Sequence, residues 1–143
     1  MSVRVVQSET VQTSSGILRW LGLIPAVVIG TIVTWFIASI LSGIGWAQVG
    51  FDPDGFLVKA FRVCFTHIAA GVAFVYFGTE AAPGHQTTVG LVLAGLGLLI
   101  AGFLAFPAFM VKDYWAIAGA VSVVMGIGGA LQAVFVKYGR SQP

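Results

Sequence analysis

Four long segments without a charged residue constrain the fold of this chain more than any other feature. They comprise residues 20–51, 63–79, 81–111 and 114–136. Each holds or approaches the roughly 20 apolar residues that an α-helix needs to cross a bilayer. Only 8% of the 143 residues are charged, against about a quarter in soluble domains. The sequence therefore predicts an all-α integral membrane protein, a bundle of four transmembrane helices joined by short loops.

The uncharged segments and the loop residues between them define one transmembrane domain over residues 17–138. Polar residues 1–16 show no helical periodicity and predict a flexible N-terminal tail, and residues 139–143 form a C-terminal tail. Nothing in the spacing of the segments indicates a second domain. The four predicted helices lie near residues 18–43, 56–78, 87–109 and 114–137.

Basic residues near the helix ends indicate how the chain is oriented in the membrane. Four crossings place both termini and the 79–86 loop on one side. The basic residues of that side are Arg4, Arg19, Lys137 and Arg140, and those of the opposite side are Lys59, Arg62 and Lys112. Under the positive-inside rule we expect both termini in the cytoplasm and a multi-pass protein of the plasma (inner) membrane.

Small residues recur at helical spacing and gather on single faces of the predicted helices. Lipid tails are as apolar as leucine, so bulky side chains gain little from a protein partner, whereas small residues let two helix backbones approach closely. We therefore expect helix–helix contacts along these faces, with hydroxyl groups bonding between helices. The predicted packing residues are Gly30, Thr34, Ala38 and Ser42 in the first helix, Gly90, Ala94, Gly97 and Ala101 in the third, and Gly119, Ser122, Gly126 and Ala130 in the fourth.

His67 lies inside the second predicted helix, one turn after Cys64. A histidine there could be a haem ligand, a metal ligand or a proton relay. The other histidine, His85, lies beyond the helix end, roughly 16 Å away along the axis, and a Cys-x-x-His pair supplies at most two of the four ligands of a closed zinc site. We therefore expect a neutral histidine bonded to a neighbouring helix carbonyl or to Thr66. His67 is a candidate cofactor ligand only as the alternative, and no catalytic residue, metal or cofactor is predicted.

Lys59 and Arg62 lie one turn apart at the start of the second helix. Long basic side chains in that position extend to the lipid head groups, with Asp52 and Asp54 as available partners. The alternative is a contact with an anionic lipid or a partner subunit. The same arc of this helix holds Thr66, Ala69, Ala70 and Ala73.

Three functions fit the predicted bundle. The favoured one is a non-catalytic small membrane subunit that packs through its small-residue faces into a homo-oligomer or a larger membrane complex. A homo-oligomeric channel or small-solute carrier is the second, with a pore lined by hydroxyl groups, and a haem- or quinone-linked anchor using His67 is the third. The expected partners are membrane lipids and other membrane subunits, because a net charge of +2 is too small to indicate nucleic acid. The pore residues would be Thr31, Thr34, Ser42, Thr66 and His67.

Overall fold

The computed structural model describes residues 3–50, 52, 54–82 and 84–139, and for residues 3–19, 47 and 49 it describes the backbone alone. Within this part of the chain there are four α-helices, which confirms the predicted all-α fold. They are α1 (Val3–Val49), α2 (Phe56–Ala81), α3 (Gln86–Met110) and α4 (Tyr114–Tyr138). Each is long and apolar enough to cross a membrane, α1 over Trp20–Trp46 and the others over their whole length.

α1 is much longer than the predicted segment 18–43, because it begins at Val3 and includes the polar residues expected to form a tail. Residues 3–15 contain neither glycine nor proline, and extending an existing helix is far easier than starting a new one. The polar stretch therefore continues the apolar part of α1 toward the N-terminus. At the other end α1 stops before Gly50, whose φ of +74° is the left-handed conformation that commonly ends a helix.

Aspartate side chains organise both connections at the opposite end of the bundle from the termini. Asp52 accepts a hydrogen bond from the backbone N–H of Asp54 at 3.1 Å and so forms a turn before α2. Asp113 caps α4, because its carboxylate accepts the backbone N–H groups of Trp115 at 3.1 Å and Ala116 at 3.2 Å. Such a cap satisfies N–H groups that have no partner within the helix.

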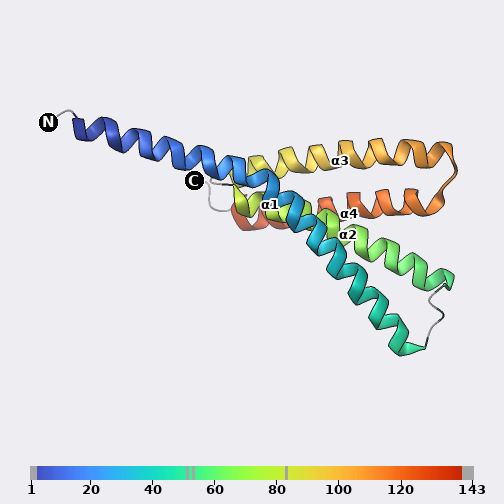
Figure 1. Cartoon of the computed structure of the whole chain (residues 1–143). Helices are drawn as coiled ribbons and strands as arrows, with labels where there is room; N and C mark the ends of the chain where they lie inside the picture. Colours follow the sequence, from blue (N-terminus) through green and yellow to red (C-terminus); the bar gives the residue numbers. More distant parts are fainter. Residues whose placement is uncertain (1–2, 51, 53, 83, 140–143) are drawn as a thin grey trace.

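α2 lies at the centre of the arrangement (Figure 1). It packs along both α1 and α4, and α4 packs in turn against α3, while the contact between α2 and α3 is smaller. Over its described residues, α1 contacts α3 and α4 much less, although Val89 of α3 packs against the cluster that includes Leu23 and Val27 of α1. As a result, the α1–α2 pair diverges from the α3–α4 pair toward the end that carries the α1–α2 and α3–α4 connections (Figure 1).

The best-packed core lies where α2, α3 and α4 meet. Val75 of α2 is fully buried there, and four side chains of α3 and α4 surround it. A second cluster joins α1 to the end of α2 through Leu23, Val27 and Ala82. The four side chains around Val75 are Ala94, Ile127, Ala130 and Val134.

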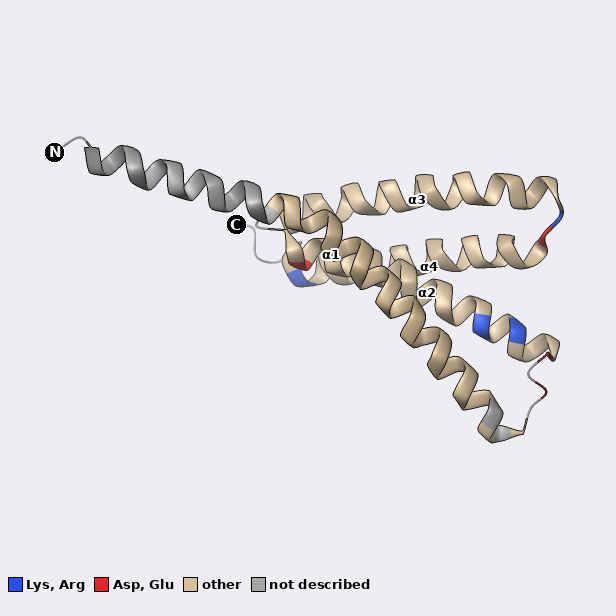
Figure 2. Ribbon diagram, in the orientation of Figure 1, with Lys and Arg blue, Asp and Glu red and all other residues tan. Residues whose placement is uncertain are grey.

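Charged side chains of the described residues gather at the two ends of the helices (Figure 2). At the end near the C-terminus, the Glu80 carboxylate accepts hydrogen bonds from Lys137 and, at 2.8 Å, from the Tyr138 hydroxyl, which ties α2 to α4. At the opposite end lie Lys59 and Arg62 of α2 and the acidic loop residues. Charge confined to helix ends is the distribution expected where the middles of the helices face hydrocarbon.

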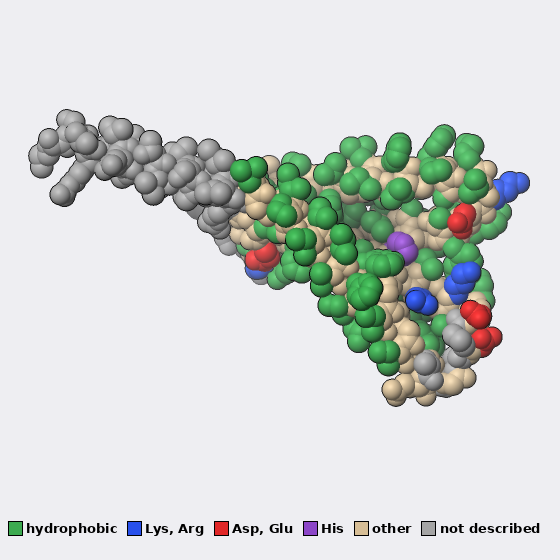
Figure 3. All heavy atoms as spheres, in the orientation of Figure 1, with side chains coloured by type: hydrophobic (Ala, Val, Ile, Leu, Met, Phe, Trp, Pro, Cys, Tyr) green, Lys and Arg blue, Asp and Glu red, His purple; other side chains and the backbone are tan. Residues whose placement is uncertain are grey.

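Large apolar side chains cover the outside of the bundle (Figure 3). Phe103 is 79% exposed and Leu99 is 73% exposed, and at most 33% of the residues in the most apolar part of any helix are buried. An exposed apolar surface of this extent marks contact with lipid or with another protein. Together the four helices suggest a multi-pass membrane protein.

Candidate functional site

Two glycines allow the backbones of α2 and α4 to touch. A Cβ added to Gly71 would lie 2.5 Å from the carbonyl oxygen of Val123, and one added to Gly126 would overlap the backbone of Ile68. Both obstacles are backbone atoms, which cannot rotate away as a side chain can. The crossing of α2 and α4 therefore requires glycine at both positions, as is typical of closely packed membrane helices.

Glycines on α3 and α4 also accommodate side chains of neighbouring helices. A Cβ on Gly97 would lie 2.7 Å from Cδ1 of Ile127, so that this isoleucine fills the notch left by the glycine. A Cβ on Gly119 would lie 3.0 Å from Nε2 of His67, which means that the imidazole rests on the backbone of α4. The small face of α3 thus receives α4, and the small face of α4 receives both α2 and α3.

Most of the predicted packing residues are buried in the structure, and Gly30 and Thr34 are half-buried. The structure brings those of α3 and α4 against their neighbours, but it does not bring the α1 residues against α3 or α4. Gly71 and Gly78 are buried packing residues that the sequence reasoning missed, although their seven-residue spacing places them on one face of α2. The buried predicted residues are Ala38, Ser42, Gly90, Ala94, Gly97, Ala101, Gly119, Ser122, Gly126 and Ala130.

The hydroxyl groups of the packing faces bond within their own helices, contrary to the expectation of bonds between helices. Thr66 donates to the carbonyl of Arg62 at 2.7 Å, and Ser122 donates to the carbonyl of Ala118 at 2.8 Å. Thr31 and Ser42 likewise donate to carbonyls three or four residues earlier. A carbonyl of the preceding turn is always within reach of such a side chain, whereas a partner on the next helix requires a suitable crossing.

His67 has a defined tautomer. Its Nδ1 lies 2.7 Å from the carbonyl oxygen of Val63 and 3.3 Å from the Thr66 hydroxyl. A carbonyl oxygen only accepts hydrogen bonds, so Nδ1 carries a proton and donates it, and in the neutral imidazole Nε2 then keeps a lone pair. The carbonyl belongs to the same helix as His67, one turn earlier, and not to a neighbouring helix, whereas the expected contact with Thr66 is present. Among the described residues no polar atom bonds to Nε2.

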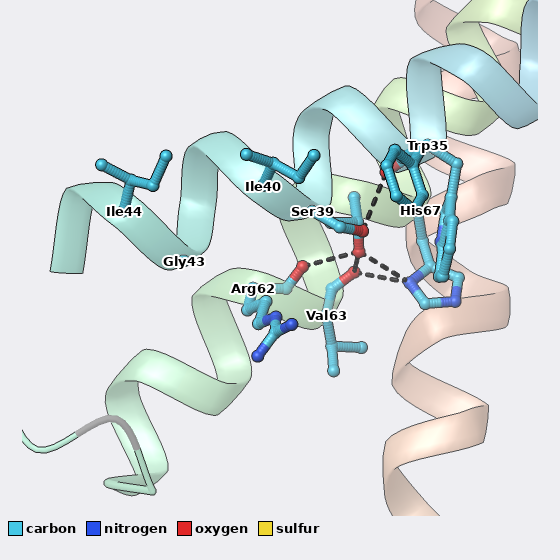
Figure 4. A pocket seen from close by; sticks show the side chains of 10 residues that line it. Trp35, Ser39, Ile40, Gly43, Ile44, Arg62, Val63 and His67 are labelled. Atoms are coloured by element: carbon cyan, nitrogen blue, oxygen red, sulfur yellow. Dashed lines mark hydrogen bonds between the residues drawn. The ribbon is translucent and has the colours of Figure 1, made fainter. Parts of the chain in front are cut away.

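Two cavities adjoin His67. The first is an open groove of about 630 Å³ between α1 and α2, with His67 at one end and Ile44 at the other (Figure 4). The second, of about 450 Å³, is bordered by residues of all four helices and is called the central cavity below. Its wall is apolar apart from Thr31 and His67. Both volumes lie within the range of small-molecule sites in proteins.

The two basic residues at the start of α2 have different surroundings. The Lys59 ammonium lies 5.0 Å from the centre of the Trp115 ring of α4, a cation–π contact, and Phe56 packs against the same ring at 5.4 Å. Arg62 lines the groove between α1 and α2 (Figure 4). Within the described part of the chain, neither forms an ion pair with Asp52 or Asp54.

The remaining candidate ligand residues lie apart from His67. His85 precedes α3 in the α2–α3 connection, and Cys64 is a half-buried free thiol. No group of three His, Cys, Asp or Glu residues within the described ranges lies close enough together to hold a metal ion. What distinguishes the interior is thus a set of glycine contacts and one imidazole facing an apolar cavity. No protein-family model, curated protein or solved structure matches the chain.

Proposed function

We propose that the chain is a multi-pass integral membrane protein that acts as a non-catalytic subunit, packing against further membrane helices of its own copies or of a larger complex. One observation carries this proposal: over its described residues α1 packs mainly along α2, with a smaller contact to α3 near Val89, and leaves most of its apolar surface exposed. A helix held on one side only is exposed over most of its length, and its most apolar segment is only 17% buried.

The outward-facing glycines support the same proposal. Gly95 and Gly102 of α3 have no atom within 4 Å of the position of an added Cβ, and their seven-residue spacing places them on one face. A glycine inside a helix costs about 1 kcal/mol relative to alanine. Contact with lipid does not offset that cost, whereas a second helix can offset it by packing closely against the glycine. We therefore assign this outward face of α3, defined by Gly95 and Gly102, to contact with a second copy.

A double substitution, Gly95→Leu with Gly102→Leu, tests the assignment. We expect the wild-type chain to form a defined oligomer in mild detergent, and the double variant to dissociate with a dissociation constant raised at least about tenfold, because bulk on this face keeps the helices apart. Native mass spectrometry and cross-linking in the membrane measure the oligomer. Gly128→Leu adds the same bulk at an open position of α4 and serves as the matched control.

Two outcomes contradict the proposal. A wild-type chain that stays monomeric in lipid, with no co-purifying membrane protein, removes the subunit function. An oligomer that survives the double substitution but is lost in Gly128→Leu moves the contact from α3 to α4. Retained helicity by circular dichroism separates lost assembly from lost folding in either variant.

Membrane topology gives a separate prediction. In a Cys64→Ala background, cysteines introduced at Gly84 and Gly139 should react with an impermeant maleimide from the cytoplasmic side, and one at Lys112 from the opposite side. The reason is that an even number of crossings returns the chain to its starting side. Labelling of right-side-out and inverted vesicles measures this. If Gly84 and Lys112 react from the same side, α3 does not cross the membrane.

The channel hypothesis has less support than the subunit hypothesis. A pore that replaces the hydration shell of an ion needs oxygen atoms directed at the ion. Thr31, Ser42 and Thr66 instead direct their hydroxyl protons at carbonyls of their own helices. Flux measurements in liposomes with verified insertion would revive this hypothesis if they detected transport of an ion or small solute.

A further inference from the structure

We propose that the central cavity binds a lipid-soluble quinol, whose ring hydroxyl donates a hydrogen bond to Nε2 of His67. The proposal concerns a ligand and is independent of the oligomeric state. It rests on the tautomer of His67, on the access of Nε2 to the cavity, and on the size and lining of that cavity.

Nε2 of His67 is an acceptor that the protein leaves unused. The Nδ1 proton is directed at the carbonyl of Val63 at 2.7 Å, so in the neutral imidazole the lone pair is on Nε2. Every fully buried side-chain nitrogen or oxygen atom of the described, non-exposed residues has a hydrogen-bond partner. Because Nε2 has no partner, it is not fully buried but partly accessible. The face of the imidazole rests on Gly119 of α4, and His67 itself lines the central cavity.

The depth of His67 makes an unused acceptor unfavourable. Along α2 it lies about 17 Å from Phe56 and about 21 Å from Ala81, at 1.5 Å per residue. If α2 crosses the bilayer, the imidazole lies near the middle of the hydrocarbon, where water is scarce. A polar group there without a hydrogen bond costs free energy. A ligand that donates a hydrogen bond to Nε2 therefore removes that cost.

The cavity selects the body of the ligand. A cavity of about 150 Å³ is enough to hold benzene, and the central cavity has about 450 Å³. It therefore has room for a substituted ring and the beginning of an alkyl or isoprenoid tail. Phe74 supplies an aromatic wall, while Gly97, Ile100 and Leu104 of α3 supply an apolar one. The cavity is only partly enclosed, so that the tail can extend out of it.

The tautomer selects the reduced form of the ligand. A quinol carries O–H groups and can donate to Nε2, whereas a quinone carries only carbonyl oxygens, which accept. A quinone would place two acceptors against each other. The dimethyl ether of the quinol keeps the ring and the tail but has no proton to donate. These three compounds therefore separate hydrogen bonding from simple partition into an apolar cavity.

Binding of a decyl-substituted benzoquinol, its quinone and its dimethyl ether to the purified full chain in lipid nanodiscs tests the proposal. Under anaerobic conditions, tryptophan fluorescence should report a quinol affinity about tenfold higher than that of the ether and the quinone. The ¹⁵N resonance of the unprotonated Nε2 should move only with the quinol. His67→Phe keeps a ring but removes the acceptor, and should make the three affinities equal.

Two further variants keep the test decisive. Ala116→Leu adds bulk at an exposed residue that lines the cavity, and it should weaken all three compounds together. His85→Asn changes the histidine outside the cavity and should change none. The proposal is overturned if the wild-type chain binds quinol and ether equally. It is also overturned if His67→Phe retains the preference, or if the ligand-free spectrum places the proton on Nε2.

Discussion

Replacing Gly126 with alanine should destabilise the folded bundle by about 3 kcal/mol, the upper part of the range for overpacked interiors. The added methyl group would overlap the backbone of Ile68, and a backbone can only respond by moving the whole helix. Moving α4 from α2 also opens the reciprocal contact of Gly71 with Val123. The free energy of unfolding, measured by helicity in mixed micelles of increasing denaturing detergent, reports this loss.

Gly128→Ala is the matched control, two residues away on the same helix. No atom lies within 4 Å of its added Cβ, so only intrinsic helix propensity acts. Alanine is favoured over glycine in a helix by about 1 kcal/mol. The same chemical change should therefore lower stability at one position and leave it unchanged or raise it at the other. Equal effects at both positions would mean that α2 and α4 do not cross at Gly126.

Combining Gly126→Ala with Gly71→Ala follows from the same contact. Both substitutions force the same two backbones apart, so the second costs little once the first has separated them. Their effects should therefore be strongly non-additive, as is usual for residues in contact. Additive losses would indicate that the two glycines accommodate different neighbours.

The three helices α2 to α4 follow from the sequence because each contains a long uncharged apolar run and lies between residues that end helices. Their bounds in the structure differ from the predicted ones by at most three residues. α1 departs from this rule, because its helix continues beyond the apolar run as far as Val3 through residues 3–15, which contain neither glycine nor proline. Hydropathy marks the part of a helix that can enter lipid. It does not mark where the helix itself begins.

Which face of a helix meets a partner is harder to predict than the helix itself. On α2 the small residues Ala69, Ala70 and Ala73 suggest one face, but the backbone contact with α4 uses Gly71. Several faces of an apolar helix carry small residues, and the position of the neighbouring helix selects among them. That position depends on all the helices together, so a periodic pattern in one segment cannot supply it.

One part of the surroundings of His67 could be predicted from the sequence, and the other could not. Its hydrogen bond to Val63 is local, with a spacing of four residues, and such a bond is always available to a polar side chain in a helix. The cavity beside Nε2 is not local, because residues of four helices border it. Sequence reasoning identified the residue as a candidate, but only the packing of α3 and α4 places open space next to it.

The Ile127 side chain of α4 fills the space left by Gly97 of α3, so changes in size at these two positions should compensate each other. Ile127→Val removes the Cδ1 atom that occupies the notch at Gly97 and should cost about 1 kcal/mol. Gly97→Ala places a methyl group 2.7 Å from that atom and should cost about 1–2 kcal/mol through overpacking. Together the changes should nearly restore wild-type stability, since the new methyl group takes the space that Cδ1 leaves. The next atom, Cδ1 of Phe74, lies at an ordinary 3.4 Å.

The two single variants and the double variant form a double-mutant cycle. This cycle separates the contribution of close packing from that of the hydrophobic effect, a distinction that matters for a protein surrounded by lipid. In water, burial of apolar surface would increase the contribution of Ile127 to the free energy of unfolding, regardless of which side chains surround it. In a bilayer the solvent is itself apolar, so close contact supplies most of the stabilisation. A coupling energy of about 2 kcal/mol between Gly97 and Ile127, measured by unfolding in mixed micelles, would show that shape holds α3 on α4. Additive effects would show that the size of the side chains alone holds α3 on α4. They would contradict the assignment of Gly97 as the notch for Ile127.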